Sequence, residues 1–256
     1  MLIDTHCHLN SNKFDDNVEE VINRALNNDV KTMIVVGYDH ETNRKAIKLA
    51  EQYSFIYATV GFHPTEAKDI EDKDFAELIP LLSHEKVVGI GECGLDFYWD
   101  KDHKEKQIEV FQRQIELSKE YSLPLIIHMR DATEATYKVL SKYENIRGIM
   151  HCYSGSAEMV PLFIKQGLHI SLGGPVTFKN GRIPKEVAKI VPLDKLLVET
   201  DSPYLSPHPF RGKTNEPAKV KLIAEEIARI KELPYSKIAE ETTKNAMKLF
   251  NLKELN

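Results

Sequence analysis

Seven side chains with the chemistry of metal ligands stand at or just after short apolar segments along the whole chain. They are His6, His8, His63, Glu92, His128, His151 and Asp201. Imidazole and carboxylate groups are good ligands for divalent transition ions. A lone histidine is more often a hydrogen-bonded structural residue, but burying this whole set together without a cation would cost several kcal/mol per ion. The set therefore predicts a site for metal ions.

The spacing of His6 and His8 indicates a strand that carries two ligands on one face. Side chains alternate between the two faces of a strand, so both imidazoles point the same way and Cys7 points the other way. The same argument turns each remaining cysteine away from the ligand before it, Cys93 from Glu92 and Cys152 from His151. All three cysteines are expected to pack against helices. Their odd number and the absence of a CxxC pair argue against disulfides and a thiolate zinc site.

Short apolar runs alternate with longer stretches of helical periodicity, which is typical of parallel strands joined by crossover helices. The expected strands are residues 2–6, 32–38, 56–62, 87–92, 124–128, 147–151, 169–172 and 196–199. Amphipathic helices are expected between them, for example where Val18, Ile22 and Ala25 share a face. Pro234 precedes one further helix, expected over residues 235–250.

This rhythm predicts an α/β fold, a single (β/α)8 TIM-type barrel with an extra C-terminal helix, as one domain over residues 1–256. A doubly wound open sheet is the structural alternative. The barrel is favoured because the candidate ligands follow strands drawn from the whole chain, and a closed ring brings all of their carboxyl ends together.

The composition narrows the possible classes of protein. The chain has 34 Lys and Arg against 39 Asp and Glu, a formal charge of -5, which disfavours a broad surface for gripping duplex nucleic acid. Its hydrophobic content of 42% suits a globule with a sizeable core. The sequence shows neither a membrane span nor a signal peptide, so a cytoplasmic location is expected. No obligate protein partner is predicted.

Six segments, in order along the chain, resemble the TatD family of metal-dependent deoxyribonucleases. They are IDTHCHL (3–9), GFHP (61–64), GIGECGLD (89–96), PLIIH (124–128), HCYSG (151–155) and ETDSP (199–203). The resemblance implies a TIM-type barrel and hydrolysis of DNA phosphodiesters, often from a 3′ end, supported by a divalent cation such as Mg²⁺. It also implies two metal sites that share Glu92, one with His6, His8 and Asp201 and the other with His128 and His151.

We expect Asp201, Glu92 and His63 to be catalytic. Asp201 would accept the proton of the attacking water, Glu92 would bridge two divalent ions, and His63 would stabilise the developing charge without binding metal. The ligand types are compatible with Mg²⁺, Mn²⁺ or Zn²⁺. The predicted partner is DNA, entering as a short single-stranded end.

Other residues are candidates for contacts with the substrate or with the ligands. Tyr98 and Trp99 could stack on a base, and Arg211 and Lys213 lie in a loop after the last strand, where barrels often bind phosphate. Glu199 lies one layer deeper than Asp201. It is interpreted as a partner that orients a metal ligand, or as the ion-pair partner of a buried cation such as Arg130.

Two other functions are compatible with this ligand set. An amidase, a deaminase or an aminoacyl-ester hydrolase could use the same barrel, although many such enzymes bridge their metals with a modified lysine where this chain has Glu92. A non-catalytic protein that binds metal or nucleic acid is the alternative from another class. The complete ligand set counts against it, since a degenerate relative is expected to lack at least one ligand.

Overall fold

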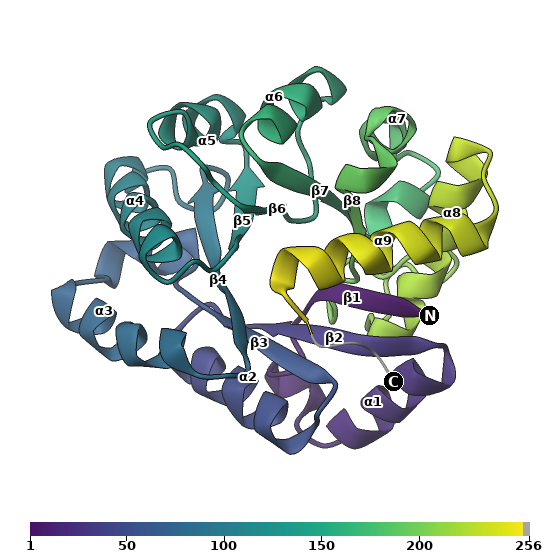
Figure 1. Cartoon of the computed structure of the whole chain (residues 1–256), viewed down its shortest axis with the longest axis horizontal. Coiled ribbons are helices and arrows are strands. Elements are labelled where there is room, and N and C mark those ends of the chain that lie inside the picture. The colour runs from purple at the N-terminus through teal and green to yellow at the C-terminus, as the bar shows by residue number, and fades with distance from the viewer. Residues whose placement is uncertain (253–256) are drawn as a thin grey trace.

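Eight parallel strands form one sheet that curls into a nearly closed barrel in the computed structural model, which describes residues 1–252 (Figure 1). The strands are β1 Leu2–Cys7, β2 Val30–Val36, β3 Ile56–Val60, β4 Val87–Asp96, β5 Leu125–Arg130, β6 Gly148–Met150, β7 Leu168–Leu172 and β8 Leu196–Val198. They pair in chain order from β1 to β8. Residues 253–256 of the predicted domain lie outside the described residues.

Helices surround the barrel. They are α1 Val18–Asn27, α2 His40–Gln52, α3 Asp72–Leu78, α4 Lys104–Glu120, α5 Thr133–Leu140, α6 Val160–Lys165, α7 Arg182–Ile190, α8 Val220–Lys231 and α9 Tyr235–Phe250. The prediction of a (β/α)8 barrel with an extra C-terminal helix is confirmed. Within residues 1–252, no helix is both long enough and apolar enough to span a membrane.

The seam between β1 and β8 closes the ring through backbone contacts. Cys7 forms an isolated parallel bridge with Ser202. The amide of His8 donates to the carbonyl of Ser202 at 2.7 Å, and the amide of Asp201 donates to the carbonyl of His6 at 2.9 Å. These bonds place Asp201 beside His6 of β1 and His8, the residue directly after this strand.

One end of the barrel is covered and the other is open. Ala246, Leu249 and Phe250 of α9 belong to the same buried cluster as Ile3 of β1 and Leu197 of β8. Figure 1 shows α9, in yellow, lying across the ring beside β1. Because apolar side chains of α9 cover the amino-terminal end, a site for polar chemistry is left at the carboxyl ends of the strands.

Strand β4 is longer than predicted and runs past Glu92 to Asp96. It stays paired with β5 there, with Gly94 opposite His128 and Asp96 opposite Arg130. Gly94 has a φ of +132°, and a Cβ at this position would collide with the carbonyl oxygen of His128. Glycine is required because it alone tolerates both the backbone angle and the close approach.

Candidate metal centre

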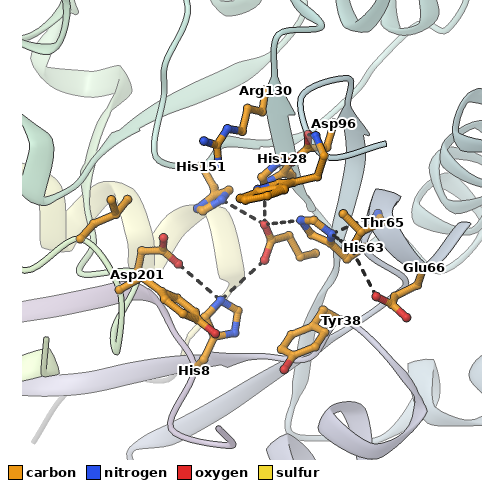
Figure 2. Close-up of a pocket in the computed structure, with 14 residues that line it drawn as sticks. His8, Tyr38, His63, Thr65, Glu66, Asp96, His128, Arg130, His151 and Asp201 are labelled. Carbon is orange, nitrogen blue, oxygen red and sulfur yellow. Dashed lines mark hydrogen bonds and ion pairs between the residues drawn. The ribbon is translucent and has the colours of Figure 1, made fainter. Parts of the chain in front are cut away.

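The predicted ligands converge at the carboxyl end of the barrel, around a cavity of about 530 Å³ (Figure 2). Its described lining residues are His8, Tyr38, His63, Thr65, Glu66, Glu92, Asp96, Trp99, His128, Arg130, His151, Asp201, Tyr204 and Leu205. His6 is completely buried beside them. Residues from β1, β4, β5 and the segments after β3, β6 and β8 thus meet at one site.

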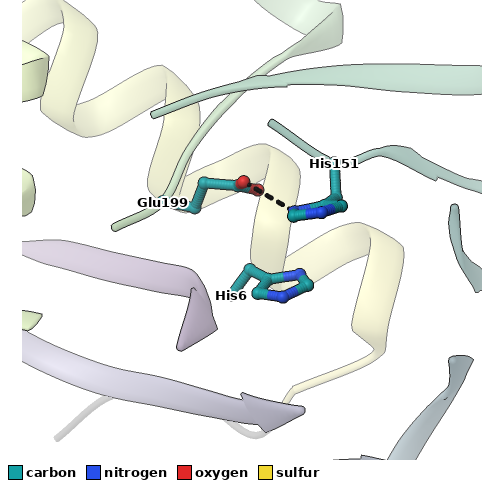
Figure 3. A group of neighbouring side chains, drawn as sticks. All are labelled: His6, His151 and Glu199. Atoms are coloured by element: carbon teal, nitrogen blue, oxygen red, sulfur yellow. Dashed lines mark hydrogen bonds and ion pairs between the residues drawn. The ribbon is translucent and has the colours of Figure 1, made fainter. Parts of the chain in front are cut away.

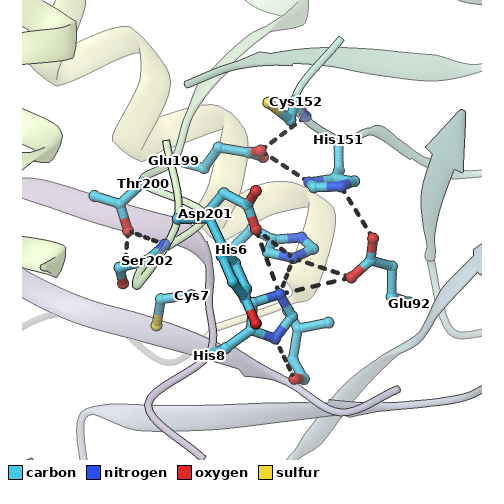
Figure 4. A network of polar contacts seen from close by, with 12 residues as sticks. His6, Cys7, His8, Glu92, His151, Cys152, Glu199, Thr200, Asp201 and Ser202 are labelled. Atoms are coloured by element: carbon cyan, nitrogen blue, oxygen red, sulfur yellow. Dashed lines mark hydrogen bonds and ion pairs between the residues drawn. The ribbon is translucent and has the colours of Figure 1, made fainter. Parts of the chain in front are cut away.

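One oxygen of the Glu92 carboxylate faces His6, in β1, and His8, directly after this strand. Glu92 Oε2 lies 3.4 Å from His6 Nε2 and 3.6 Å from His8 Nε2. Asp201 Oδ1 lies 3.6 Å and 3.4 Å from the same two nitrogens (Figure 4). Two imidazole nitrogens and two carboxylates therefore surround one position.

The other oxygen of Glu92 faces a second group of histidines. Glu92 Oε1 lies 2.8 Å from His128 Nδ1, 3.1 Å from His151 Nε2 and 3.5 Å from His63 Nε2. Glu92 thus stands between two clusters of nitrogen atoms, as a carboxylate shared by two ions would. The geometry also offers His63 as a third nitrogen on this side, since His63, Glu92 and His128 could together hold an ion.

Both carboxylates are held in the charged form that binds metal. Burial acts to raise the pKa of Glu92, but positive charge on His151 and His63 and hydrogen bonds from His128 and His151 lower it well below its usual range. Burial also acts to raise the pKa of Asp201, but the hydrogen bond from His8 and the charges of His151 and His6 lower it overall. Both groups are therefore ionised at neutral pH.

The histidines differ in their affinity for a proton. Burial and the nearby His151 lower the pKa of His6. Burial would lower the pKa of His151 as well, but Glu92 and Glu199 raise it well above the ordinary value. His6 Nε2 and His8 Nε2 lie only 3.1 Å apart, too close for both to carry a proton. Paired nitrogens beside ionised carboxylates fit a divalent cation, which would replace the protons that this cluster otherwise needs.

Glu199 lies beneath the cluster and contacts His151, as one of the two interpretations predicted (Figure 3). Its Oε1 lies 2.9 Å from His151 Nδ1 and accepts the amide hydrogen of Cys152 at 2.7 Å. Glu199 Oε2 and His6 Nδ1 are both buried and have no hydrogen-bond partner within residues 1–252. His6, His151 and Glu199 form a further group close enough to share one ion or one water.

Asp96 is a residue of this site that the sequence reasoning missed. Its Oδ2 lies 3.0 Å from His128 Nε2, and its Oδ1 accepts the amide hydrogens of Tyr98 and Trp99 at 2.9 and 2.8 Å. Asp96 follows Glu92 by four residues on β4, an even number, so strand alternation predicts that both side chains point to the same face. The alternation would have identified it if the strand had been extended beyond Glu92.

Arg130 is not a buried partner of Glu199, so the predicted ion pair between them is wrong. Arg130 is exposed, lines the cavity, and lies over the ring of Tyr98 at 4.1 Å from the ring centre. The reason is its position at the end of β5, two residues after His128, which brings it to the mouth of the barrel. Trp99 lines the same cavity.

Arg211 and Lys213, the two basic residues predicted to bind phosphate, lie in the loop after β8 and do not line this cavity. Arg211 stacks on the ring of Phe178 at 4.5 Å and donates a hydrogen bond to Asn180 at 3.3 Å. Neither Arg211 nor Lys213 is among the described residues that line the cavity. Arg130 is the one lysine or arginine among the described residues of the cavity wall.

The prediction for the cysteines holds for two of the three. Cys7 and Cys93 are fully buried in the apolar cluster between the strands and the helices. Cys152 is partly exposed, so its expected burial against the helices is wrong. The physical reason is that β6 ends at Met150, and Cys152 has a φ of +38°, so the alternation of a strand no longer applies.

Comparisons with known proteins find a matching family and relatives of similar length. The model of a family described as TatD related DNase matches residues 3–251. An uncharacterised metal-dependent hydrolase of Bacillus subtilis, YabD, is 52% identical over 254 residues, which cover 98% of this chain and 100% of the relative. YcfH of Escherichia coli K12, another uncharacterised metal-dependent hydrolase, is 36% identical over 98% of this chain and 96% of its own.

Solved structures show the same architecture. The crystal structure of YjjV, a TatD homologue from Escherichia coli K12, superimposes with a TM-score of 0.93 at 30% identity and covers 98% of both chains. A dihydroorotase from Campylobacter jejuni, at 12% identity and a TM-score of 0.61 over 100% of this chain and 84% of its own, shares the fold alone.

Proposed function

Because this chain belongs to the TatD related DNase family of metal-dependent hydrolases, we propose that it hydrolyses phosphodiester bonds in DNA, acting on single-stranded 3′ ends through two divalent ions. The observation that carries the proposal is the position of Glu92. Each of its two oxygens faces a separate group of histidine nitrogens, at 2.8 to 3.6 Å. The family description supports DNA as the substrate.

The donor set fits Mg²⁺, Mn²⁺ or Zn²⁺. His6, His8, Glu92 and Asp201 would hold one ion, and Glu92, His128 and His151 the other. When bound, such ions would polarise a phosphate oxygen and lower the pKa of an attacking water. The protein positions these ligands and supplies the groups that move protons.

Asp201 is the residue proposed to accept the proton of the attacking water. Its carboxylate is at the cavity wall with 14% of the side chain exposed, and its lowered pKa keeps it unprotonated at neutral pH. Attack on phosphorus breaks the bond to a sugar oxygen, which leaves with a negative charge. His63 Nδ1 accepts the amide hydrogen of Thr65 at 3.2 Å, which leaves the proton on Nε2. This N–H, at the cavity wall beside Glu92, is the group proposed to donate a hydrogen bond to that charge.

The shape and charge of the molecule favour a strand end over a duplex. The cavity of about 530 Å³ is in the range of sites for small ligands, so it suits one nucleotide at a time. The formal charge of -5 provides no general attraction for a long polyanion. Arg130 on the cavity wall offers a local cation for a phosphate.

The test is cleavage of end-labelled oligonucleotides by protein reconstituted with Mg²⁺, Mn²⁺ or Zn²⁺. Single-stranded and duplex DNA of the same sequence, labelled at the 5′ or the 3′ end, are followed over time. We expect progressive shortening from the 3′ end, faster for the single strand. Elemental analysis of the same samples should approach two ions per chain.

The matched variants are Glu92→Ala, which removes the shared carboxylate, and Glu186→Gln, which changes an exposed glutamate paired with Arg182 on α7. Glu92→Ala is expected to lose at least one ion and all measurable cleavage, while Glu186→Gln keeps both. Reconstituted wild-type protein that holds two ions and leaves every oligonucleotide intact would refute the proposal, and hydrolysis of an aminoacyl ester by that sample would identify the alternative.

A further inference from the structure

Two large aromatic side chains are exposed at the mouth of the barrel, directly after β4. Trp99, the only tryptophan of the chain, is 67% exposed, and Tyr98 is 47% exposed. Their rings contact each other edge to face, with centres 5.0 Å apart. Exposed aromatic rings at the edge of a cavity commonly mark a binding surface, because burying them in contact with a ligand is favourable.

A positive charge completes this cluster. The guanidinium of Arg130 lies 4.1 Å from the ring centre of Tyr98 and 5.4 Å from that of Trp99. Trp99 and Arg130 both line the cavity that contains His128 and Glu92. An aromatic surface and a cation thus adjoin the metal ligands at the place where a substrate would enter.

The segment that carries the two aromatic residues is anchored to the metal centre. Asp96 Oδ1 accepts the backbone amides of both Tyr98 and Trp99, while its other oxygen contacts His128 Nε2 at 3.0 Å. The buried Gln107 of α4 accepts the Asp96 amide and donates to the carbonyl of Asp96. The Asp96 side chain therefore links the backbone that carries the two rings to the candidate metal ligand His128.

We propose that Trp99, Tyr98 and Arg130 form a stacking platform for an unpaired nucleobase adjacent to the phosphate at the metal centre. This proposal rests on the proposed function. It adds that the enzyme recognises an unpaired nucleobase of its substrate. Any of the four nucleobases can stack on an aromatic ring. Arg130 can form an ion pair with the neighbouring phosphate. A base inside a duplex is covered by its neighbours, so the platform selects for single strands.

The tryptophan itself provides the measurement. Because Trp99 is the only tryptophan, the intrinsic tryptophan fluorescence of the metal-reconstituted protein comes from the platform alone. The probes are a short single-stranded oligonucleotide with non-hydrolysable phosphorothioate linkages and the same oligonucleotide with abasic sites near its 3′ end. We expect strong quenching by the first probe and little by the second. Equal quenching by both would overturn the proposal.

Variants measure the contribution of stacking, through the fluorescence anisotropy of end-labelled probes, because Trp99→Ala and Trp99→Phe contain no tryptophan. Trp99→Ala is expected to weaken binding of the base-containing probe roughly 5- to 150-fold, the range for loss of one stacked base, and to leave abasic binding nearly unchanged. Trp99→Phe should retain most of the affinity. Tyr143→Ala, a change of an aromatic residue that follows α5 outside the cavity lining, is the matched control.

The outcomes separate the two proposals. If the wild-type protein cleaves DNA but Trp99→Ala binds the base-containing probe as tightly as Tyr143→Ala does, the stacking platform is overturned. The proposal of a deoxyribonuclease then still stands. Failure of the wild-type protein, loaded with two ions, to bind or cleave any oligonucleotide would overturn the proposed function, and the platform with it.

Discussion

Replacing Glu199 by glutamine tests whether this buried carboxylate controls metal binding from beneath the ligands. Glu199 is completely buried, and one of its oxygens serves both His151 Nδ1 and the Cys152 amide. The amide oxygen of glutamine can keep both contacts, and its NH2 group would replace the oxygen that has no partner within residues 1–252. The variant therefore removes the negative charge and little else.

The expected loss of metal affinity follows from the effect of the Glu199 charge on His151. Burial acts to lower the pKa of His151, and Glu92 and Glu199 together raise it well above the usual value, so His151 is a strong base in this site. Loss of a carboxylate behind a metal-binding histidine typically weakens metal affinity 10- to 100-fold, which is about 1.4 to 2.7 kcal/mol. We expect this loss for the ion on the His151 side of Glu92.

Calorimetric titration of metal-free protein with Zn²⁺ and with Mn²⁺ measures the effect. Glu186→Gln provides the control for removal of a glutamate charge at an exposed site. Glu199→Ala should also lower the unfolding temperature, because it leaves a cavity and two buried donors without an acceptor. If Glu199→Gln binds two ions with wild-type affinity, Glu199 has no role in tuning the centre and its contact with His151 is merely structural.

Three further predictions use the same protein. Asp201→Asn should reduce single-turnover cleavage by about 10²- to 10⁴-fold, and cleavage at the wild-type rate would exclude it as the base. His63→Ala should slow turnover but retain both ions, and elemental analysis showing an emptied site would make His63 a ligand. Burial, together with the charge of Lys195, lowers the pKa of His169 from 6.5 in the unfolded chain to about 4 in the folded chain. Between these two pH values, His169 is protonated in the unfolded chain and neutral in the folded chain. Stability present above pH 6.5 should fall by up to about 3 kcal/mol as the pH drops to 4, and denaturant titrations of His169→Gln should lack this slope.

The architecture could be predicted because two independent patterns agree. The alternation of apolar runs with helical periodicity indicated strands and crossover helices, and the dispersal of ligands along the chain indicated a ring. The extent of β4 could not be predicted from apolar character. Residues 91–96 contain two glycines and two acids, and they stay in the strand because Gly94 allows the close approach to β5.

The convergence of the candidate metal ligands could be predicted because their positions follow from strand parity and strand ends. The same reasoning failed at Cys152, where the strand has already ended. The contact between Glu199 and His151 links residues 48 positions apart. The sequence suggested a supporting role for Glu199 but could not choose between His151 and Arg130 as its partner, since that depends on how β6 and β8 are placed around the ring.

At the mouth of the barrel the parity argument holds for β4 and β5, and both of these strands extend beyond their predicted ends. Asp96 follows Glu92 by four residues on β4, and Arg130 follows His128 by two on β5, so continued alternation places both at the cavity. Arg211 and Lys213 belong to a loop, where no period applies. The cation proposed to meet the substrate therefore comes from a strand that also carries a metal ligand. Its position relative to the candidate ligands is therefore set by the barrel rather than by a loop, as expected of a group proposed to hold a phosphate in line for attack.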